Sequence, residues 1–269
     1  MKKANIILIG ANGFFGKNIQ LFLKNKYNLK NIKRNDNFKN LNFQKFTHVI
    51  NCAAEVYNDK KMMENNSLLV DALLKKMINQ NKLIKLIHFG SSAEYGLLHS
   101  PAKETNQLKP RTVYEATKAS SCLLVKGYSD QYKLNSVIIR PFSIYGPHEN
   151  LTRLIPNIFR HFMFNDNLKI FGGYHDFVYI NDMIRFIDIL LKKNHKFYDG
   201  KIINFGSGKQ YSNYQILKIC EKIFKKKSKC KVVNTFQRSY DNKIWMSDNS
   251  YLTKKVKFKF RYNIINGIK

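Results

Sequence analysis

The chain has 269 residues, of which 44% are hydrophobic and 13% aromatic, and its formal net charge at pH 7 is +29. This length allows one large domain or two modest ones, and the apolar content indicates a globular chain rather than a disordered one. No apolar run approaches the roughly 20 residues that cross a bilayer, and we expect the short run near the N-terminus to be a first strand, not a signal peptide. The four cysteines lack C-x-x-C spacing, which predicts reduced thiols in a cytoplasmic protein.

Positive charge is concentrated in the last third of the chain. Residues 1–191 hold 27 Lys and Arg against 14 Asp and Glu, whereas residues 192–269 hold 20 against 4. Nucleic-acid binding is one interpretation, because basic patches neutralise phosphates. However, the lysines are scattered, and the two dense clusters, Lys225–Lys227 and Lys254–Lys257, belong to no recognisable nucleic-acid module. We therefore expect a positive field that attracts a small anionic substrate, and no nucleic-acid partner.

The first pattern in the chain is a run of branched apolar residues, Ile6–Ile9, followed by glycines at positions 10, 13 and 16. The run predicts a strand buried on both faces, as in a parallel sheet. The glycines lead into an apolar, helix-like stretch, Phe14–Leu23. Backbone amides and the dipole at such a helix start favour a phosphate, and glycine lets the backbone approach it. The pattern predicts a dinucleotide-binding turn; the alternative is an ordinary turn with glycines for packing.

A short second strand is expected at Asn31–Arg34. The residue at its end normally meets the adenosine ribose, where an acid binds a free 2′-hydroxyl and an arginine accepts a 2′-phosphate. Arg34 lies 18 residues after Gly16, and Asp36 lies 20 after it, so the spacing allows either. Because Asp36 falls in a predicted loop and Lys33 adds charge beside Arg34, we favour Arg34 and therefore NADP.

The next segments continue an alternating β/α order. Strands are expected at His48–Ala54 and Ile84–Gly90, with an amphipathic helix at Asn66–Ile78 between them. Two serines, Ser91 and Ser92, follow the later strand directly. Ligands bind at the carboxyl ends of strands in open α/β sheets, so these serines are candidate site residues.

A tyrosine and a lysine, Tyr114 and Lys118, begin a predicted helix that runs to about Tyr132. They lie one helical turn apart on the same face. A lysine ammonium favours the phenolate and lowers the pKa of the phenol from about 10, so the tyrosine can exchange a proton near neutral pH. The pair alone is a weak signal, but a serine at a strand end and an upstream glycine turn strengthen it.

These motifs together resemble the extended short-chain dehydrogenase/reductase family, which includes nucleotide-sugar epimerases, dehydratases and 4-keto reductases. The motifs that carry the resemblance are Gly10-x-x-Gly13-x-x-Gly16, Gly90–Gly96, Tyr114-x-x-x-Lys118, Arg140–Pro147, Asp176–Ile180 and Asn204–Gly208. The resemblance implies an α/β fold, with a Rossmann-type doubly wound parallel sheet and a small C-terminal substrate-binding lobe. Residues 1–145 would form the dinucleotide-binding domain and 146–269 the lobe, with the chain returning to the first domain at about 175–205.

The resemblance also implies roles for individual residues. Tyr114 would be the acid/base, Lys118 would hold the nicotinamide ribose, and Ser91 would be the catalytic serine, four residues before Tyr95. Ser92 is the adjacent alternative. The predicted cofactor-binding residues are Gly10, Asn12, Gly13, Phe14, Phe15, Gly16, Arg34, Ala53, Ala54, Tyr114 and Lys118.

Substrate contacts are expected from Ser92, Ser143, Arg153, His175 and Arg238. Many relatives carry asparagine where Ser143 stands and arginine where His175 stands, so specific sugar contacts do not transfer there. His175 is expected to be a polar wall of the pocket and not a metal ligand, because no second His or Cys has ligand spacing. Arg238 is a candidate for the nucleotide pyrophosphate, with a solvated loop arginine as the alternative.

The residues after Ser91 narrow the expected reaction. Dehydratases of the family place an Asp-Glu pair there, whereas this chain has Ser92 and Ala93, and Glu94 would face the opposite side of an extended segment. We therefore expect NADPH-dependent reduction of a nucleotide-activated 4-keto-6-deoxy sugar. The alternative is a nucleotide-sugar 4-epimerase with tightly bound NAD, and a less favoured one is a non-catalytic NADP- or nucleic-acid-binding protein. The resemblance implies a homodimer through the helices near Asn66–Ile78 and Tyr114–Tyr132.

Overall fold

In a computed structural model, described over residues 3–33, 36, 38–80, 83–236 and 242–269, the chain forms two compact units. Unit 1 comprises Met1–Gly96, Gln107–Pro141 and Ile184–Ile203, and unit 2 comprises Leu97–Asn106, Phe142–Met183 and Asn204–Lys269. The chain enters unit 2 first over Leu97–Asn106 and again after Pro141, and it returns to unit 1 over Ile184–Ile203. The predicted boundaries were residue 145 for the passage to the second domain and about 175–205 for the return.

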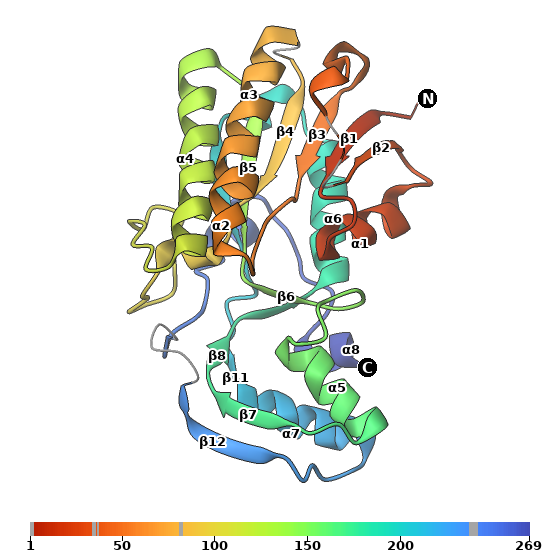
Figure 1. Cartoon of the computed structure of the whole chain (residues 1–269), viewed down its shortest axis with the longest axis vertical. Helices are drawn as coiled ribbons and strands as arrows, with labels where there is room; N and C mark the ends of the chain where they lie inside the picture. Colours follow the sequence, from red (N-terminus) through yellow and green to blue (C-terminus); the bar gives the residue numbers. More distant parts are fainter. Residues whose placement is uncertain (1–2, 34–35, 37, 81–82, 237–241) are drawn as a thin grey trace. The chain divides into compact units, whose positions relative to one another are not determined.

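A six-stranded sheet forms the centre of unit 1 (Figure 1). Its strands are β1 (Asn5–Ile9), β2 (Asn28–Ile32), β3 (His48–Asn51), β4 (Lys85–Phe89), β5 (Ser136–Pro141) and β10 (Lys201–Phe205), in the spatial order β10-β5-β4-β3-β1-β2. The pairs from β2 through β1, β3 and β4 to β5 are parallel. The predicted doubly wound parallel sheet is therefore confirmed.

Both faces of this sheet are covered. The helices of unit 1 are α1 (Phe14–Leu23), α2 (Asp59–Met62), α3 (Leu69–Gln80), α4 (Val113–Tyr132) and most of α6 (Ile180–Leu191). All four residues Ile6–Ile9 are buried, as a strand covered on both faces requires. On the side of α1 and α6, the hydroxyl of Tyr27 donates a hydrogen bond to Asp188 over 2.8 Å.

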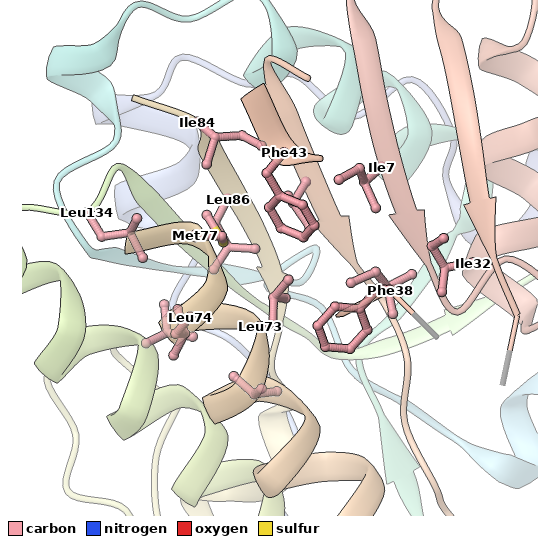
Figure 2. Close-up of a cluster of buried hydrophobic side chains, with 14 of the residues drawn as sticks. Ile7, Ile32, Phe38, Phe43, Leu73, Leu74, Met77, Ile84, Leu86 and Leu134 are labelled. Carbon is pink, nitrogen blue, oxygen red and sulfur yellow. The ribbon is translucent and has the colours of Figure 1, made fainter. Parts of the chain in front are cut away.

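On the side of α3 and α4, apolar side chains fill the space between helices and sheet (Figure 2). Ile7 of β1 and Leu86 of β4 meet Leu73 and Met77 of α3, and Phe43 from the connection before β3 joins them. All five side chains are fully buried. Burying one such side chain stabilises the fold by about 1.5–3 kcal/mol, so this cluster fixes the sheet that carries the site residues.

Two elements differ from the prediction. The second strand is Asn28–Ile32 rather than Asn31–Arg34, and its polar composition suits its position at the edge of the sheet. The helix expected at Asn66–Ile78 is helical from Asp59, with a π-helical turn at Met63–Leu68. The apolar pattern does not reveal the helical residues before Asn66, because polar hydrogen bonds rather than apolar packing fix the segment. For example, the Asn66 side-chain amide donates to the Glu55 carbonyl over 3.0 Å.

Over its described residues, unit 2 contains short paired strands, three α-helices of its own, the start of α6 and a π-helical turn at Tyr251–Lys255. The strand pairs are β7 (Lys169–Gly172) with β12 (Lys231–Phe236), β8 (Tyr174–His175) with β11 (Tyr211–Ser212), and β6 (Ser143–Tyr145) with β9 (Phe177–Tyr179). The helices are α5 (Leu154–Phe164), α7 (Asn213–Phe224) and α8 (Ile264–Ile268). Ser212 caps the start of helix α7, and Lys225 ends it with a φ of +52°.

The apolar core of unit 2 is separate from that of unit 1. Ile158 and Phe162 of α5 pack with Ile216 and Cys220 of α7 over Ile170 of β7. In the described part of the chain, no helix combines the length and the apolar character that crossing a membrane requires.

Candidate active site

The glycine turn after β1 has the tight geometry that the sequence predicts. Gly10 has a φ of +86°, and a Cβ there would lie 2.6 Å from the backbone nitrogen of Ala53. At Gly16 a Cβ would collide with the carbonyl oxygen of Gly10, whereas at Gly13 it would lie 3.3 Å from the same oxygen. The Gly13 amide donates to the Gly10 carbonyl over 3.0 Å and closes the turn. The shape of the turn therefore depends most on Gly10 and Gly16.

The amino end of α1 is exposed and lacks a side-chain cap. Gly13 is its N-cap residue, so no capping side chain satisfies the amides of the first turn. Asn12 and Gly13 are exposed, Phe14 is half-buried, and the ring of Phe15 lies 4.7 Å from that of Phe89. Unpaired amides and the positive end of the helix dipole suit a phosphate at this position.

Alanine substitutions at Gly16 and Gly13 should have different effects on stability, because a Cβ collides with backbone at Gly16 but only touches a carbonyl oxygen at Gly13. We expect Gly16→Ala to lower the free energy of unfolding, without any ligand, by about 3 kcal/mol, because the new Cβ meets backbone that cannot move aside. Gly13→Ala should cost about 1 kcal/mol or less, because its Cβ only touches the Gly10 carbonyl and glycine is merely a better N-cap than alanine. Urea unfolding of both variants measures the difference, and equal losses would contradict this account of the turn.

The predicted ribose end of the cofactor site is described only in part. Arg34 lies outside the described residues, so its contact with a 2′-phosphate stays a prediction. The Asp36 carboxylate accepts a hydrogen bond from the Lys33 amide over 2.8 Å, so one of its oxygens already has a partner within the chain. Ala53 and Ala54 follow β3 and are half-buried, at the same carboxyl edge of the sheet as the glycine turn.

Ser91 follows β4 and caps a 3₁₀-helix, Ser92–Tyr95. Its Oγ accepts a hydrogen bond from the Ala93 amide over 3.1 Å, and the Glu94 carboxylate accepts one from the Ser91 amide over 2.6 Å. Ser92 is buried. The assumption of an extended segment after Ser91 is therefore wrong: the capping box turns the chain into a helix and directs Glu94 toward the interior.

Glu94 belongs to a buried ion pair that sequence reasoning missed. Its Oε2 lies 2.7 Å from Nε of Arg140 in β5, and both side chains are at most 2% exposed. The Arg140 guanidinium also donates to the Tyr95 hydroxyl over 2.9 Å, and the Cys122 thiol donates to Glu94 Oε1 over 3.0 Å. Every oxygen of this carboxylate is thus occupied within the interior. Glu94 stabilises the turn that presents Ser91 and is not a carboxylate available to a substrate.

Helix α4 carries the predicted Tyr–Lys pair. It packs against the 3₁₀-helix that Ser91 caps, and Thr112 and Glu115 form a capping box at its start. Tyr114 is half-buried in its first turn. One turn later, Lys118 is 2% exposed, and its ammonium donates to the Phe89 carbonyl over 2.6 Å. Burial lowers the pKa of Lys118 from its usual value, and the nearby Cys122 and Glu94 oppose this shift.

A buried chain of hydrogen bonds supports α4 behind Lys118. Ser121 Oγ donates to the Lys118 carbonyl over 2.8 Å, so Nε2 of His88 donates to Ser121 Oγ over 3.1 Å. Nδ1 of His88 then accepts from the Asn51 amide over 3.3 Å. This assignment requires a neutral ring, and burial indeed lowers the pKa of His88 well below its usual value. Neither His88 nor Ser121 follows a local motif, so sequence reasoning gave no signal for them.

Three predicted substrate residues lie in unit 2. Ser143 Oγ is 3.1 Å from Nδ1 of His175, so the structure brings these two together. Arg153 is the N-cap residue of α5, and its Nε lies 3.7 Å from the buried Glu149 carboxylate. Another predicted substrate residue, Arg238, lies outside the described residues.

Asp176, within the Asp176–Ile180 motif, organises the loops around His175. Its Oδ1 accepts from the Ser207 amide over 2.7 Å, and its Oδ2 accepts from the Gly208 and Ser247 amides over 3.0 and 3.1 Å. Burial raises the pKa of Asp176, while the bonds from Ser207 and Ser247 oppose this shift. The motif therefore has a structural role that the sequence alone does not reveal.

Comparison with known proteins identifies the family. The model of the NAD dependent epimerase/dehydratase family matches residues 6–206, which include the glycine turn, Ser91, Tyr114 and Lys118. The chain belongs to this family. The predicted resemblance to extended short-chain dehydrogenases/reductases is thereby confirmed.

Several curated relatives of this chain are named as enzymes that act on nucleotide sugars. The chain is 28% identical to UDP-glucuronate 4-epimerase from Thermodesulfobacterium geofontis over 268 residues, which cover 90% of this chain and 81% of the epimerase. It is 26% identical to dTDP-D-glucose 4,6-dehydratase from Dictyostelium discoideum over 266 residues, which cover 79% of this chain and 60% of the dehydratase. In five of the curated relatives, this dehydratase among them, the chain spans only 34–60% of the relative's length.

A solved structure supports the same fold over nearly the whole chain. UDP-glucuronic acid 4-epimerase from Bacillus cereus, crystallised with UDP-glucuronic acid and NAD, superimposes with a TM-score of 0.87 at 23% identity. The superposition covers 98% of this chain and 96% of the epimerase. The family fold therefore includes unit 2 as well as unit 1.

Proposed function

We propose that this member of the NAD dependent epimerase/dehydratase family is a nucleotide-sugar 4-epimerase that works with NAD. One observation carries the proposal. Ser91 caps a 3₁₀-helix that packs against α4, the helix that carries Tyr114 and Lys118, while Glu94, the carboxylate nearest to Ser91 in sequence, forms a buried ion pair with Arg140. An elimination needs a free acid or base beside the catalytic serine, whereas epimerisation needs only the tyrosine to move a proton. The long alignments with 4-epimerases favour this reaction over the 4-keto reduction expected from the sequence.

The residues of the glycine turn fit a dinucleotide. A Cβ at Gly10 or Gly16 would collide with backbone, and the uncapped first turn of α1 offers amides to a pyrophosphate. When bound, NAD would take a hydride from a sugar carbon and return it to the opposite face. We favour NAD over NADP because the similar solved structures were crystallised with NAD, and Arg34 remains the residue on which an NADP preference would depend.

The residues of the chain would handle the proton. Tyr114 would take the proton of the sugar hydroxyl through its phenolate oxygen and later give it back. Lys118, held by the Phe89 carbonyl one turn away, would favour the phenolate and donate to the ribose hydroxyls. Ser91 would donate a hydrogen bond to the same sugar oxygen. The Ser143–His175 pair and Arg153 are our candidates for contacts with the nucleotide sugar.

The test is conversion of UDP-linked sugars without added reductant. We expect the purified chain to turn one of UDP-glucuronic acid, UDP-glucose or UDP-N-acetylglucosamine into a mixture with its C4 epimer, measured by proton NMR, with no net change in nicotinamide absorbance. Consumption of NADPH with a nucleotide-linked 4-keto sugar, and no epimerisation of any UDP- or dTDP-sugar, would instead establish the reductase.

We also propose a homodimer through the helices of unit 1. Large apolar side chains on these helices face solvent in the single chain: Met63 is 54% exposed, Leu68 58% and Leu123 61%. The segment Met63–Leu68 packs against α4, so these exposed apolar side chains lie on neighbouring helices and call for another partner. We expect Leu123→Glu to convert the dimer to a monomer in light scattering, and Leu21→Glu on α1, at an equally exposed leucine, to leave it unchanged. A monomeric parent chain would refute this proposal.

A further inference from the structure

A basic hollow in unit 2 contains none of the residues assigned above. It has a volume of about 740 Å³, within the range of small-molecule sites. Its walls come from the end of α5, the start of β7, and the connection between α7 and β12, which lie together in the lower part of Figure 1. Five lysines line it, Lys169, Lys226, Lys227, Lys229 and Lys231, together with His161.

Carboxylates do not neutralise these five lysines. Among the described lining residues the single acid is Asp166, which is ion-paired with Arg160. In the described part of the chain, no ion pair joins any of the five to a carboxylate; Lys226 donates to the neutral Asn165 amide over 3.0 Å. Lys227 does lower the pKa of Glu221, but that carboxylate is bound to Lys218 over 2.7 Å. The hollow therefore has excess positive charge.

The fold itself does not account for this charge. Lys169 of β7 and Lys231 of β12 are direct register partners in a parallel strand pair, where like charges destabilise the pairing. A lysine near the end of α7 complements the helix dipole, which explains Lys226. Lys229 and Lys231 belong to a loop and a strand start, where no such dipole attracts them. The Lys169 ammonium lies 4.7 Å from the centroid of the Phe171 ring, a contact that leaves its positive charge in place. A bound anion would relieve the repulsion among these lysines.

The floor of the hollow is held in place by hydrogen bonds. Nδ1 of His161 donates to the Asp166 carbonyl over 2.7 Å, and its Nε2 forms a hydrogen bond of 2.9 Å with the Ser228 hydroxyl. Ser228 Oγ in turn accepts from the Cys230 amide over 3.1 Å, and its own amide donates to Glu221 over 3.0 Å. The loop that carries Lys227, Lys229 and Lys231 is thus fixed to α5 and α7.

We propose that this hollow binds a small anion that carries two or more phosphate groups, independently of the catalytic residues. Lysine binds phosphate as a flexible point charge, and five of them around one concavity match a ligand with several negative charges. A nucleic acid would instead require a basic surface that continues along its backbone. The proposal also gives Lys226 and Lys227, two lysines of the dense cluster Lys225–Lys227, a role that a steering field does not require.

The test uses the full chain with inorganic triphosphate as the probe, by calorimetry at about 0.15 M salt. A triple variant, Lys227→Gln, Lys229→Gln and Lys231→Gln, removes charge from the hollow. A matched control, Lys24→Gln, Lys30→Gln and Lys45→Gln, removes the same charge from exposed positions of unit 1. We expect the first variant to weaken binding at least tenfold and the control to change it less than twofold, with excess UDP failing to displace triphosphate from the parent chain.

Three outcomes would overturn the proposal. Equal weakening in both triple variants would mean that triphosphate senses only the net charge of the chain. Displacement by UDP would assign the binding to the active site. Absence of triphosphate binding, together with tight and salt-dependent binding of a duplex oligonucleotide that the first triple variant weakens and the control does not, would assign the lysines to nucleic acid.

Discussion

Replacement of Tyr114 by phenylalanine is expected to lower kcat about 10²–10⁴-fold while the fold stays intact. Tyr114 lies in the first turn of α4, one turn before the buried Lys118, and α4 packs against the helix that Ser91 caps. The substitution removes the oxygen that would exchange the proton but retains the ring. Because this interaction strengthens only in the transition state, KM should change little. Initial rates of C4 epimerisation, followed by NMR on the substrate that the parent chain converts, measure the loss.

The matched control for this variant is Tyr132→Phe at the other end of the same helix. Tyr132 is 42% exposed and its ring lies 5.5 Å from that of Tyr128, so loss of its hydroxyl should leave both kcat and stability unchanged. Circular dichroism and thermal unfolding of the two variants should match the parent chain. Turnover by Tyr114→Phe within a few-fold of the parent would eliminate the proposed proton transfer, whatever the substrate.

Structural features that depend on residues close together in the sequence were predictable from the sequence. Ile6–Ile9 and the glycine spacing predict a strand, a turn and a helix, and the helix has the predicted bounds Phe14–Leu23. The turn chemistry is equally local, since Gly10 needs a positive φ and Gly16 meets backbone. The polar edge strand Asn28–Ile32 was misplaced, because an edge strand has little apolar pattern to mark its start.

Structural features that depend on contacts between residues far apart in the sequence were not predictable. The Glu94–Arg140 pair joins positions 46 residues apart, and nothing near Glu94 in sequence indicates its partner. Asp182 lies in the first turn of α6, and its buried carboxylate also accepts the amides of Arg261 and Tyr262, about 80 residues away. A single sequence gives the chemistry of such carboxylates but not the element that folds against them.

The ion pair between Glu94 and Arg140 should have the largest effect on stability in unit 1. Glu94→Gln keeps the size of the side chain and an oxygen for the Ser91 amide, but leaves the Arg140 guanidinium buried without a counter-charge. Removing one partner of a buried pair costs about 3–5 kcal/mol, because the remaining charge stays desolvated. Urea unfolding should show this loss, whereas Asp130→Asn, which removes the exposed pair with Lys126, should cost about 1 kcal/mol or less.

A double-mutant cycle separates the charge from the packing. Arg140→Met alone should be as damaging as Glu94→Gln, because it leaves the Glu94 carboxylate unpaired. The double variant should recover stability relative to either single variant, since neither unpaired charge remains, and the coupling energy should exceed 1 kcal/mol. Simple additivity would mean that the two side chains act through packing alone. Because the Glu94 carboxylate also accepts a hydrogen bond from the Ser91 amide, additivity would equally mean that the ion pair does not help to hold Ser91 in place.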